Sequence, residues 1–176
     1  MTIRTPRRRL TVVAVLGTAL GAVLAMSTTP ASAASSDGYI SGSGGFRNDW
    51  SDEFVSSGAR SNAVCMWQKI LWAEGLLSNP EVDGVFGGKT VQRTRTLQSR
   101  WHVSPTGKAD NTTFTAAAAP ARLKYVSGST GSGKRLVLKY DGFDHDFNLV
   151  RNERGRYEFH LDGAWKPGTY KKRTCQ

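Results

Sequence analysis

A short pattern that occurs twice constrains the fold of this 176-residue chain more than any other feature of its sequence. Segment 83–90 (DGVFGGKT) aligns with segment 106–113 (TGKADNTT), so that glycine matches glycine and threonine matches threonine before a following helix. An apolar residue and a glutamine, Trp67-Gln68 and Leu97-Gln98, stand before each turn. The sequence therefore predicts a helix, a glycine turn and a helix, used twice with the middle helix shared.

Capping residues and helical periodicity place three helices around these turns. The first helix is predicted over 61–75, with Ser61 or Asn62 as its cap, and the second over 89–101. The third is predicted over 111–119, with Asp110 as its N-cap and Pro120 after its end. The predicted unit is a small three-helix bundle.

The first predicted helix is apolar on two neighbouring faces. One face carries Val64, Trp67 and Leu71, and the other carries Cys65 and Trp72. A helix that is apolar over this much of its circumference is buried on more than one side. Since the other two helices cover only one side, a further element must cover Cys65 and Trp72.

Beyond a Gly/Ser-rich loop at 127–133, the spacing of apolar residues changes to two, which is typical of strands. The alternating residues are Leu136, Leu138 and Tyr140, then Phe147 and Leu149, then Tyr157, Phe159 and Leu161. The predicted fold class is α+β: a small three-helix bundle followed by a small antiparallel β extension packed on it. The expected organisation is 1–33 signal peptide, 34–59 flexible Gly/Ser-rich linker, 60–120 helical domain and 121–176 β extension. Phe46, Trp50 and Phe54 interrupt the linker, so docking of part of it on the helical domain is the alternative.

The amino terminus is typical of an exported chain. Arg4 and Arg7 to Arg9 precede an apolar run, 10–26, and small residues at Ala31 and Ala33 form a cleavage site. A membrane anchor is the alternative, but Thr and Gly residues dilute the run. Export by the general or the twin-arginine route stays open. We expect a secreted product, extracellular or associated with a cell wall, with no membrane segment after cleavage.

The mature chain is basic. Removing 1–33 takes four of the 24 Lys+Arg residues, which leaves 20 against 14 Asp+Glu and a net charge of +6. Such a charge suits an acidic polymer, namely nucleic acid, anionic lipid or a bacterial wall. Export makes nucleic acid the poorest of these partners. We expect a monomer whose partner is a wall polymer, with no nucleic acid.

The two cysteines, Cys65 and Cys175, are expected to pair, because exported chains with an even number of cysteines usually form disulfides. Two free thiols are the alternative. The bond would clamp the β extension onto the first helix. The sheet face that needs a cover is expected to include Trp165 together with the apolar residues of 157–161.

The order of motifs along the helical unit resembles the peptidoglycan-binding-like family of three-helix modules over residues of about 60–119. The resemblance is carried by Val64-x-x-Trp67-Gln68, Gly75-Leu76, Asp83-Gly84-x-Phe86-Gly87-x-x-Thr90, Leu97-Gln98 and Thr106-Gly107-x-Ala109-Asp110-x-x-Thr113-Phe114. Trp67 stands where the family usually has Leu, and Trp101-His102-Val103 replaces its usual Gly-Leu step. The resemblance implies a secreted wall-binding module of the kind often attached to a hydrolase.

Several residues of this unit are candidates for contact with peptidoglycan or another anionic wall polymer. Gln68 and Gln98 are expected to be buried amides, whose partners are the turn backbones or, alternatively, the ligand. Lys89, Arg93 and Arg100 form a basic stripe, and arginine suits carboxylates and phosphates. The candidate ligand-binding residues are Gln68, Asp83, Lys89, Arg93, Gln98, Arg100 and Trp101.

Catalysis is not expected, and no cofactor or metal is predicted. The three histidines fall in separate segments, and Cys175 is the penultimate residue, so neither a metal-ligand pair nor a thiol active site is apparent. The acidic segment 141–146 is interpreted as a hairpin loop, because it has no EF-hand spacing. The alternatives are a secreted protein-binding or inhibitory module that keeps the helical unit as a scaffold, and a small wall hydrolase with an unrecognised site.

Overall fold

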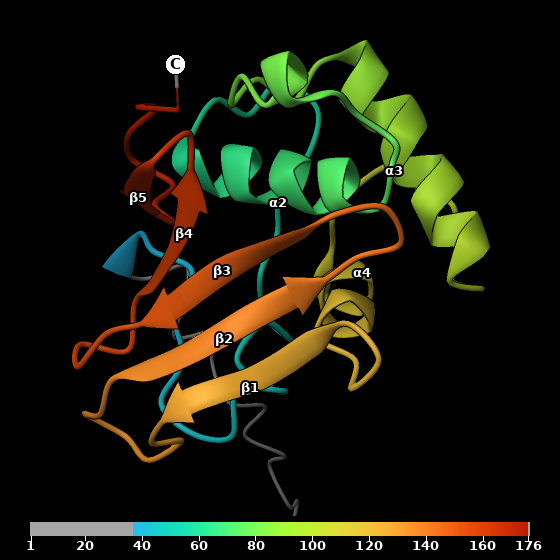
Figure 1. Ribbon diagram of the computed structural model, residues 1–176. Helices are drawn as coiled ribbons and strands as arrows, with labels where there is room; N and C mark the ends of the chain where they lie inside the picture. The colour runs from blue at the N-terminus through green and yellow to red at the C-terminus, as the bar shows by residue number, and fades with distance from the viewer. Residues whose placement is uncertain (1–36, 176) are drawn as a thin grey trace, which may run out of the picture.

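The computed structural model describes residues 37–175 (Figure 1). The expected signal peptide, 1–33, lies outside the described residues, as do 34–36 and 176. The described elements are the helices α2 (Asn62–Ala73), α3 (Gly88–Arg100) and α4 (Asn111–Ala117), the short 3-10 helix η1 (Asn79–Glu81), and the strands β1 (Leu123–Gly128), β2 (Leu136–Asp141), β3 (Asp146–Arg151), β4 (Tyr157–Leu161) and β5 (Ala164–Pro167).

The three predicted helices are confirmed, with ends that differ from the expected ones by no more than two residues. The Ser61 hydroxyl caps α2 by accepting a hydrogen bond from the Val64 amide at 3.3 Å. The Asp110 carboxylate caps α4 by accepting one from the Thr113 amide at 3.0 Å. Local polar side chains therefore fix where two of the three helices begin.

The β extension is a five-stranded antiparallel sheet with the order β1-β2-β3-β4-β5. The strands around 136–140, 147–149 and 157–161 are present as expected. The two edge strands, β1 and β5, were not anticipated. Their residues are mostly exposed and show no regular alternation, so pairing with a neighbouring strand, rather than burial, makes them strands.

Helix α2 packs between α3 and the sheet and contacts both α3 and β2 (Figure 1). All of its residues are buried except Trp72, which is half-buried. The buried face of the sheet lies in the same hydrophobic core as α2 and includes Leu138, Leu149 and Phe159. The prediction that a second element covers α2 is therefore correct.

Trp165 does not belong to that buried face. It pairs across the sheet with His160, its ring meets the His160 ring at 5.4 Å, and it is exposed. Because neighbouring residues of a strand point to opposite faces, a residue paired with His160 lies on the face opposite to that of Phe159 and Leu161. The expectation that Trp165 helps to cover α2 is wrong.

The segment predicted as a flexible linker, 34–59, is packed into the fold wherever it is described. Ile40, Trp50 and Val55 are buried. The Ile40 amide donates to the Gly168 carbonyl at 2.7 Å, and the amides of Val55 and Ala109 donate to each other's carbonyls at 2.9 Å. Of the aromatic residues that interrupt the Gly/Ser-rich composition, Phe46 and Trp50 are buried and Phe54 is exposed. The linker interpretation is therefore wrong for residues 37–59.

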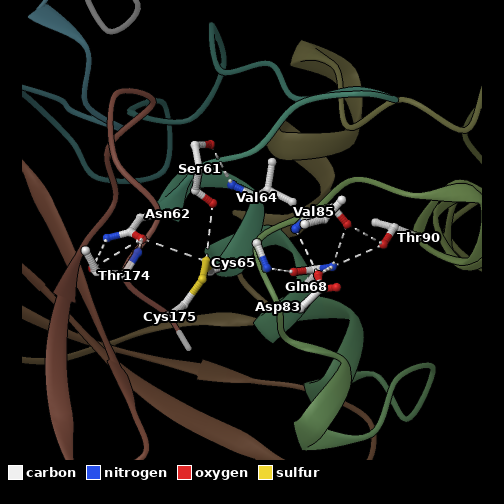
Figure 2. Close-up of a disulfide and its surroundings, with 11 residues drawn as sticks. Ser61, Asn62, Val64, Cys65, Gln68, Asp83, Val85, Thr90, Thr174 and Cys175 are labelled. Atoms are coloured by element: carbon white, nitrogen blue, oxygen red, sulfur yellow. Dashed lines mark hydrogen bonds between the residues drawn. A yellow bond between two sulfur atoms is a disulfide. The ribbon is translucent and has the colours of Figure 1, made fainter.

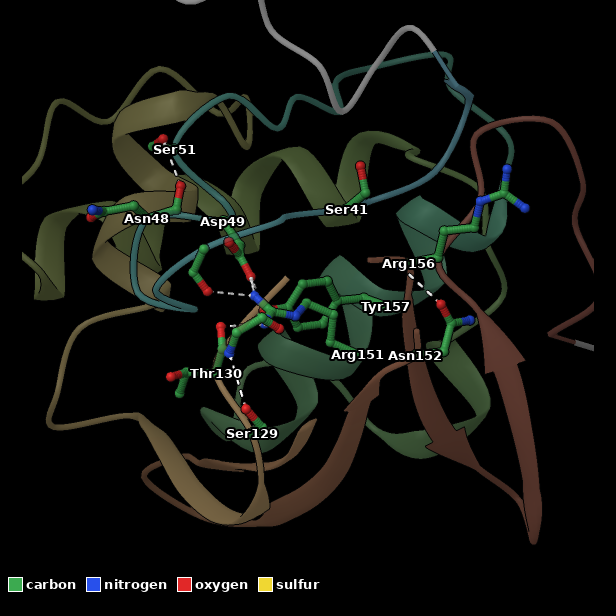
Figure 3. Close-up of polar contacts among 12 residues, drawn as sticks. Ser41, Asn48, Asp49, Ser51, Ser129, Thr130, Arg151, Asn152, Arg156 and Tyr157 are labelled. Carbon is green, nitrogen blue, oxygen red and sulfur yellow. Dashed lines mark hydrogen bonds and ion pairs between the residues drawn. The ribbon is translucent and has the colours of Figure 1, made fainter. Parts of the chain in front are cut away.

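Trp50 joins the two parts of the fold. Its ring meets Phe114 of α4 at 6.3 Å and Tyr157 of β4 at 5.6 Å, both edge-on. The preceding residue, Asp49, accepts hydrogen bonds from Arg151 Nη1 at 2.6 Å and from the Tyr157 hydroxyl at 2.7 Å (Figure 3). Burial and the Asp49 carboxylate raise the pKa of Tyr157. The N-terminal segment thus holds helices and sheet in one core.

The expected disulfide is present between Cys65 of α2 and Cys175, whose Cα atoms are 6.3 Å apart (Figure 2). The C-terminal tail also binds the start of α2, since the Thr174 amide donates to Asn62 Oδ1 at 2.7 Å. The first glycine turn packs against the bond: a Cβ on Gly84 would lie 2.7 Å from both sulfur atoms. The disulfide therefore joins the tail, α2 and the first turn.

Candidate ligand-binding surface

Each turn of the repeat is held by a buried glutamine, as the sequence predicts. At the first turn, Gln68 Oε1 accepts from the Gly84 amide at 2.7 Å, and Nε2 donates to the Val85 carbonyl at 3.1 Å (Figure 2). At the second, Gln98 Oε1 accepts from the Gly107 amide at 2.8 Å. Its Nε2 donates to the Lys108 carbonyl at 2.8 Å. Both side-chain amides therefore form hydrogen bonds that hold the turns.

The remaining contacts at the turns follow the same repeat. Gln68 Nε2 also donates to Asp83 Oδ1 at 2.8 Å, and Gln98 Nε2 to Thr106 Oγ1 at 3.0 Å. Asp83 Oδ1 further accepts from the Val85 amide at 2.8 Å, which closes the turn on itself. The candidate residues Gln68, Asp83 and Gln98 therefore have structural roles.

The basic residues of α3 do not act as one stripe. Lys89 forms an ion pair with Glu81 of η1. The Arg93 side chain is exposed and makes no ion pair or hydrogen bond with any residue between 37 and 175. Arg100, at the end of the helix, donates from Nη1 to the Glu74 carbonyl at 2.9 Å. Arg100 thus lies at the junction between α3, the end of α2 and the sheet.

A pocket of about 430 Å³ opens at this junction. We call it the seam pocket, because both the helical unit and the β extension supply its walls. It is lined by Glu74, Arg100, Trp101, Arg122 and Phe143. Two of the sequence-predicted candidates, Arg100 and Trp101, therefore lie together in one site, while Lys89 and Arg93 lie outside it.

Positive charge exceeds negative charge in the seam pocket. The buried Glu74 carboxylate accepts from the Tyr140 hydroxyl at 2.8 Å and lies 3.8 Å from Arg122 Nε. Burial and this carboxylate raise the pKa of Tyr140. The Arg122 guanidinium lies 4.3 Å from the centre of the half-buried Trp101 ring, a cation–π geometry. Two guanidiniums thus face the pocket against one carboxylate.

Besides Trp101, the pocket has a second aromatic residue, Phe143, at the tip of the β2–β3 hairpin, which reaches the end of α2 (Figure 1). The amides of Asp144 and His145 both donate to the Ala73 carbonyl, at 2.9 and 3.0 Å. The His145 ring stacks on Trp72 with centroids 4.3 Å apart and planes 11° apart. The hairpin tip is therefore anchored to α2, while Phe143 itself is 86% exposed.

Sequence reasoning missed Arg122 and Phe143, because both lie outside the repeat motif. The only sequence signal was an apolar residue in the middle of the polar loop 141–146. That loop is a hairpin, as expected. Among residues 37–175, no group of three His, Cys, Asp or Glu side chains is placed to hold a metal ion. None of the helices in this range is long and apolar enough to cross a bilayer.

Comparison with protein families confirms the resemblance of the helical unit. Residues 60–117 match the family model described as "Putative peptidoglycan binding domain". The match spans α2, α3 and α4 and includes Arg100 and Trp101, but ends before Arg122 and Phe143. It covers about a third of the chain. Searches of curated proteins and of solved structures gave no match.

Proposed function

We propose that this chain is a secreted, non-catalytic protein that binds peptidoglycan or another anionic wall polymer as a monomer. The family match over 60–117 supports a wall polymer as the partner. The disulfide between Cys65 and Cys175 and the signal-like amino terminus support export. The observation that carries the proposal is the seam pocket, which combines two arginines with an exposed aromatic ring.

The chemistry of the seam pocket suits binding better than catalysis. Its one carboxylate, that of Glu74, is buried behind Arg122 and already accepts a hydrogen bond from Tyr140. A general acid–base pair needs two groups within reach of the reacting atoms. Arginine is permanently protonated and serves as a hydrogen-bond donor to carboxylates and phosphates. The pocket therefore offers anion recognition and a ring for apolar contact.

One sample tests both parts of the proposal. The mature chain is incubated with purified peptidoglycan sacculi and centrifuged. Protein is measured in the pellet, and soluble muropeptides are measured in the supernatant. We expect the protein to sediment with the sacculi, to be released as salt shortens the screening length to about 10 Å at 0.1 M, and to free no muropeptides.

Two results contradict the proposal. Equal recovery of protein in the supernatant with and without sacculi at low salt would exclude wall binding and favour a protein-binding or inhibitory module. Release of muropeptides that stops on substitution of a single Asp, Glu or His would show that the protein is a hydrolase.

A further inference from the structure

We infer that the seam pocket binds a free peptide carboxylate next to an apolar side chain, as at the end of a wall stem peptide. This inference rests on the proposed function and names the part of the polymer that is recognised. In the bound state the carboxylate lies between Arg100 and Arg122, and the apolar side chain lies against Phe143.

The exposure of Phe143 is the first argument. A phenylalanine that is 86% exposed buries little apolar surface on folding. It therefore contributes little to the stability of the fold. Its loop is nevertheless held by two hydrogen bonds to the Ala73 carbonyl. Gly142 is forced to be glycine, because a Cβ there would lie 2.4 Å from the same carbonyl oxygen. The loop thus holds the backbone that carries Phe143 in a fixed position, which lowers the entropic cost of binding.

The two guanidiniums are the second argument. Arg100 and Arg122 each use Nη1 to donate to a backbone carbonyl, that of Glu74 at 2.9 Å and that of Ala116 at 3.0 Å. Neither Nη2 makes a hydrogen bond with a residue in the range 37–175. These contacts orient both groups and leave N–H donors for a ligand. Paired N–H donors are the arrangement that best fits a carboxylate.

The combination of two arginines with the Phe143 ring favours one kind of anion among those of a bacterial wall. A phosphate in a polyol chain is flanked by hydroxylated carbon atoms and offers Phe143 no apolar surface. A peptide terminus places an apolar side chain within a few bonds of its carboxylate. Such a ligand can contact Phe143 with its side chain and the arginines with its carboxylate. A neutral sugar would leave both arginines without a charged partner.

The β extension completes this site. Arg122 and Phe143 both lie outside the segment that matches the family model, 60–117, whereas Arg100 and Trp101 lie inside it. The Cys65–Cys175 bond and the Trp50 contacts hold the two parts in one core, so the pocket has fixed walls. The extension therefore supplies specificity that the three-helix unit lacks by itself.

Calorimetry on the whole mature chain tests the inference with defined probes. The ligand is a mixture of soluble muropeptides released from sacculi by a muramidase. The comparison ligand is the same mixture after its carboxylates have been converted to amides. We expect amidation to weaken binding at least about tenfold, because hydrogen bonds to charged groups are the strong ones. Glycerol phosphate should not compete at the concentrations at which muropeptides saturate.

Two variants test the two halves of the pocket. Phe143→Ser should weaken muropeptide binding about fivefold, since part of the burial of one aromatic side chain is lost. Arg100→Gln should weaken it about tenfold and reduce the difference between free and amidated ligand. Tyr125→Ser is the matched control, since Tyr125 is also an exposed aromatic side chain, on β1 and outside the pocket. It should bind like the wild type.

The inference is overturned if amidated muropeptides bind as tightly as free ones, if glycerol phosphate competes equally well, or if Phe143→Ser binds like Tyr125→Ser. Its failure is distinguishable from failure of the proposed function. Retention of the protein by whole sacculi together with any of these results rejects the pocket assignment alone. Muropeptide binding in the expected order without retention by sacculi rejects wall binding alone.

Discussion

Gln68 and Gln98 occupy equivalent positions in the two halves of the repeat. Each side-chain oxygen accepts a hydrogen bond from the glycine amide of its turn, Gly84 at 2.7 Å and Gly107 at 2.8 Å. Each Nε2 donates to the carbonyl of the residue after that glycine. The repeat in the sequence therefore corresponds to one hydrogen-bonded arrangement, a glutamine side chain bound to a glycine turn, which occurs twice.

This arrangement predicts that the two glutamines contribute to stability. Gln98→Met keeps the size of the side chain but leaves the Gly107 amide and the Lys108 carbonyl without their partner. We expect a loss of about 2–4 kcal/mol in the free energy of unfolding, because each buried polar group left unpaired costs about 1–3 kcal/mol. Urea denaturation measures it. Gln92→Met, at an exposed position of α3, is the control, and equal stability of the two variants would contradict the role of Gln98.

The pH dependence of stability should report on Glu53. Burial raises the pKa of this carboxyl from 4.5 to about 8 in the folded protein, where it contacts the Tyr170 hydroxyl. Because the folded state holds the proton of Glu53 more tightly, the contribution of this residue to the free energy of unfolding is highest below pH 4.5. It falls as pH rises from 4.5 to about 8 and then levels off.

Glu53→Gln removes this dependence without removing the hydrogen-bonding groups. As the pH rises from 5 to 8, the wild type loses stability through Glu53 and the variant does not. The difference in the free energy of unfolding should therefore shift in favour of the variant by an amount on the order of 3–5 kcal/mol. Urea denaturation of both proteins at the two pH values gives the difference, from which groups common to both cancel. A difference that does not change with pH would contradict burial of an ionisable Glu53.

The disulfide should matter for stability because it closes a loop of 110 residues. A Cys65→Ser, Cys175→Ser double variant avoids a free thiol and should lose about 4–5 kcal/mol in the chain-entropy model. Reductant should lower the melting temperature of the wild type and leave that of the double variant unchanged. Equal melting temperatures of all samples, with two titratable thiols in the wild type, would show that the bond does not form.

Trp50 tests whether the N-terminal segment belongs to the core. Trp50→Ala should cost about 3–5 kcal/mol, the usual range for removing a fully buried large aromatic side chain. Trp50→Phe should cost less, since Trp50 Nε1 is buried without a hydrogen-bond partner in the structure from 37 to 175 and its loss leaves no group unpaired. Similar stability of Trp50→Ala and the wild type would restore the view of this segment as a linker.

The helical unit could be predicted from the sequence because its determinants are local. Ser61 and Asp110 cap the helices that follow them, and the glutamines bind turns 9 to 16 residues away. The alternation along β2 and β4 was equally readable, because one face of each strand is buried. These signals lie within single elements or adjacent ones.

The remaining features depend on contacts between distant parts of the chain. Trp50 is buried because Phe114 and Tyr157 meet around it, and the aromatic residues near position 50 indicated docking but not these partners. The seam pocket unites Arg100 with Phe143, which are brought together by the docking of a hairpin on α2. Such sites follow from tertiary packing, so the sequence identified only Arg100 and Trp101 among the residues of the pocket.

The most direct test of wall binding through the end of α3 is the apparent affinity for sacculi of a charge-reversed variant. Arg100→Glu, inside the seam pocket, is compared with Lys134→Glu, an equal change of charge. The control position, Lys134, is exposed in the β1–β2 loop, at the opposite end of the sheet (Figure 1).

The α3 variant should bind about tenfold more weakly than the wild type, since a hydrogen bond to a charged group contributes roughly 1.5–3 kcal/mol. The control variant should stay within about twofold of the wild type, since general charge effects are screened. Equal weakening of both variants would show that binding depends on net charge alone. Unchanged binding of the α3 variant would contradict the assignment of this surface.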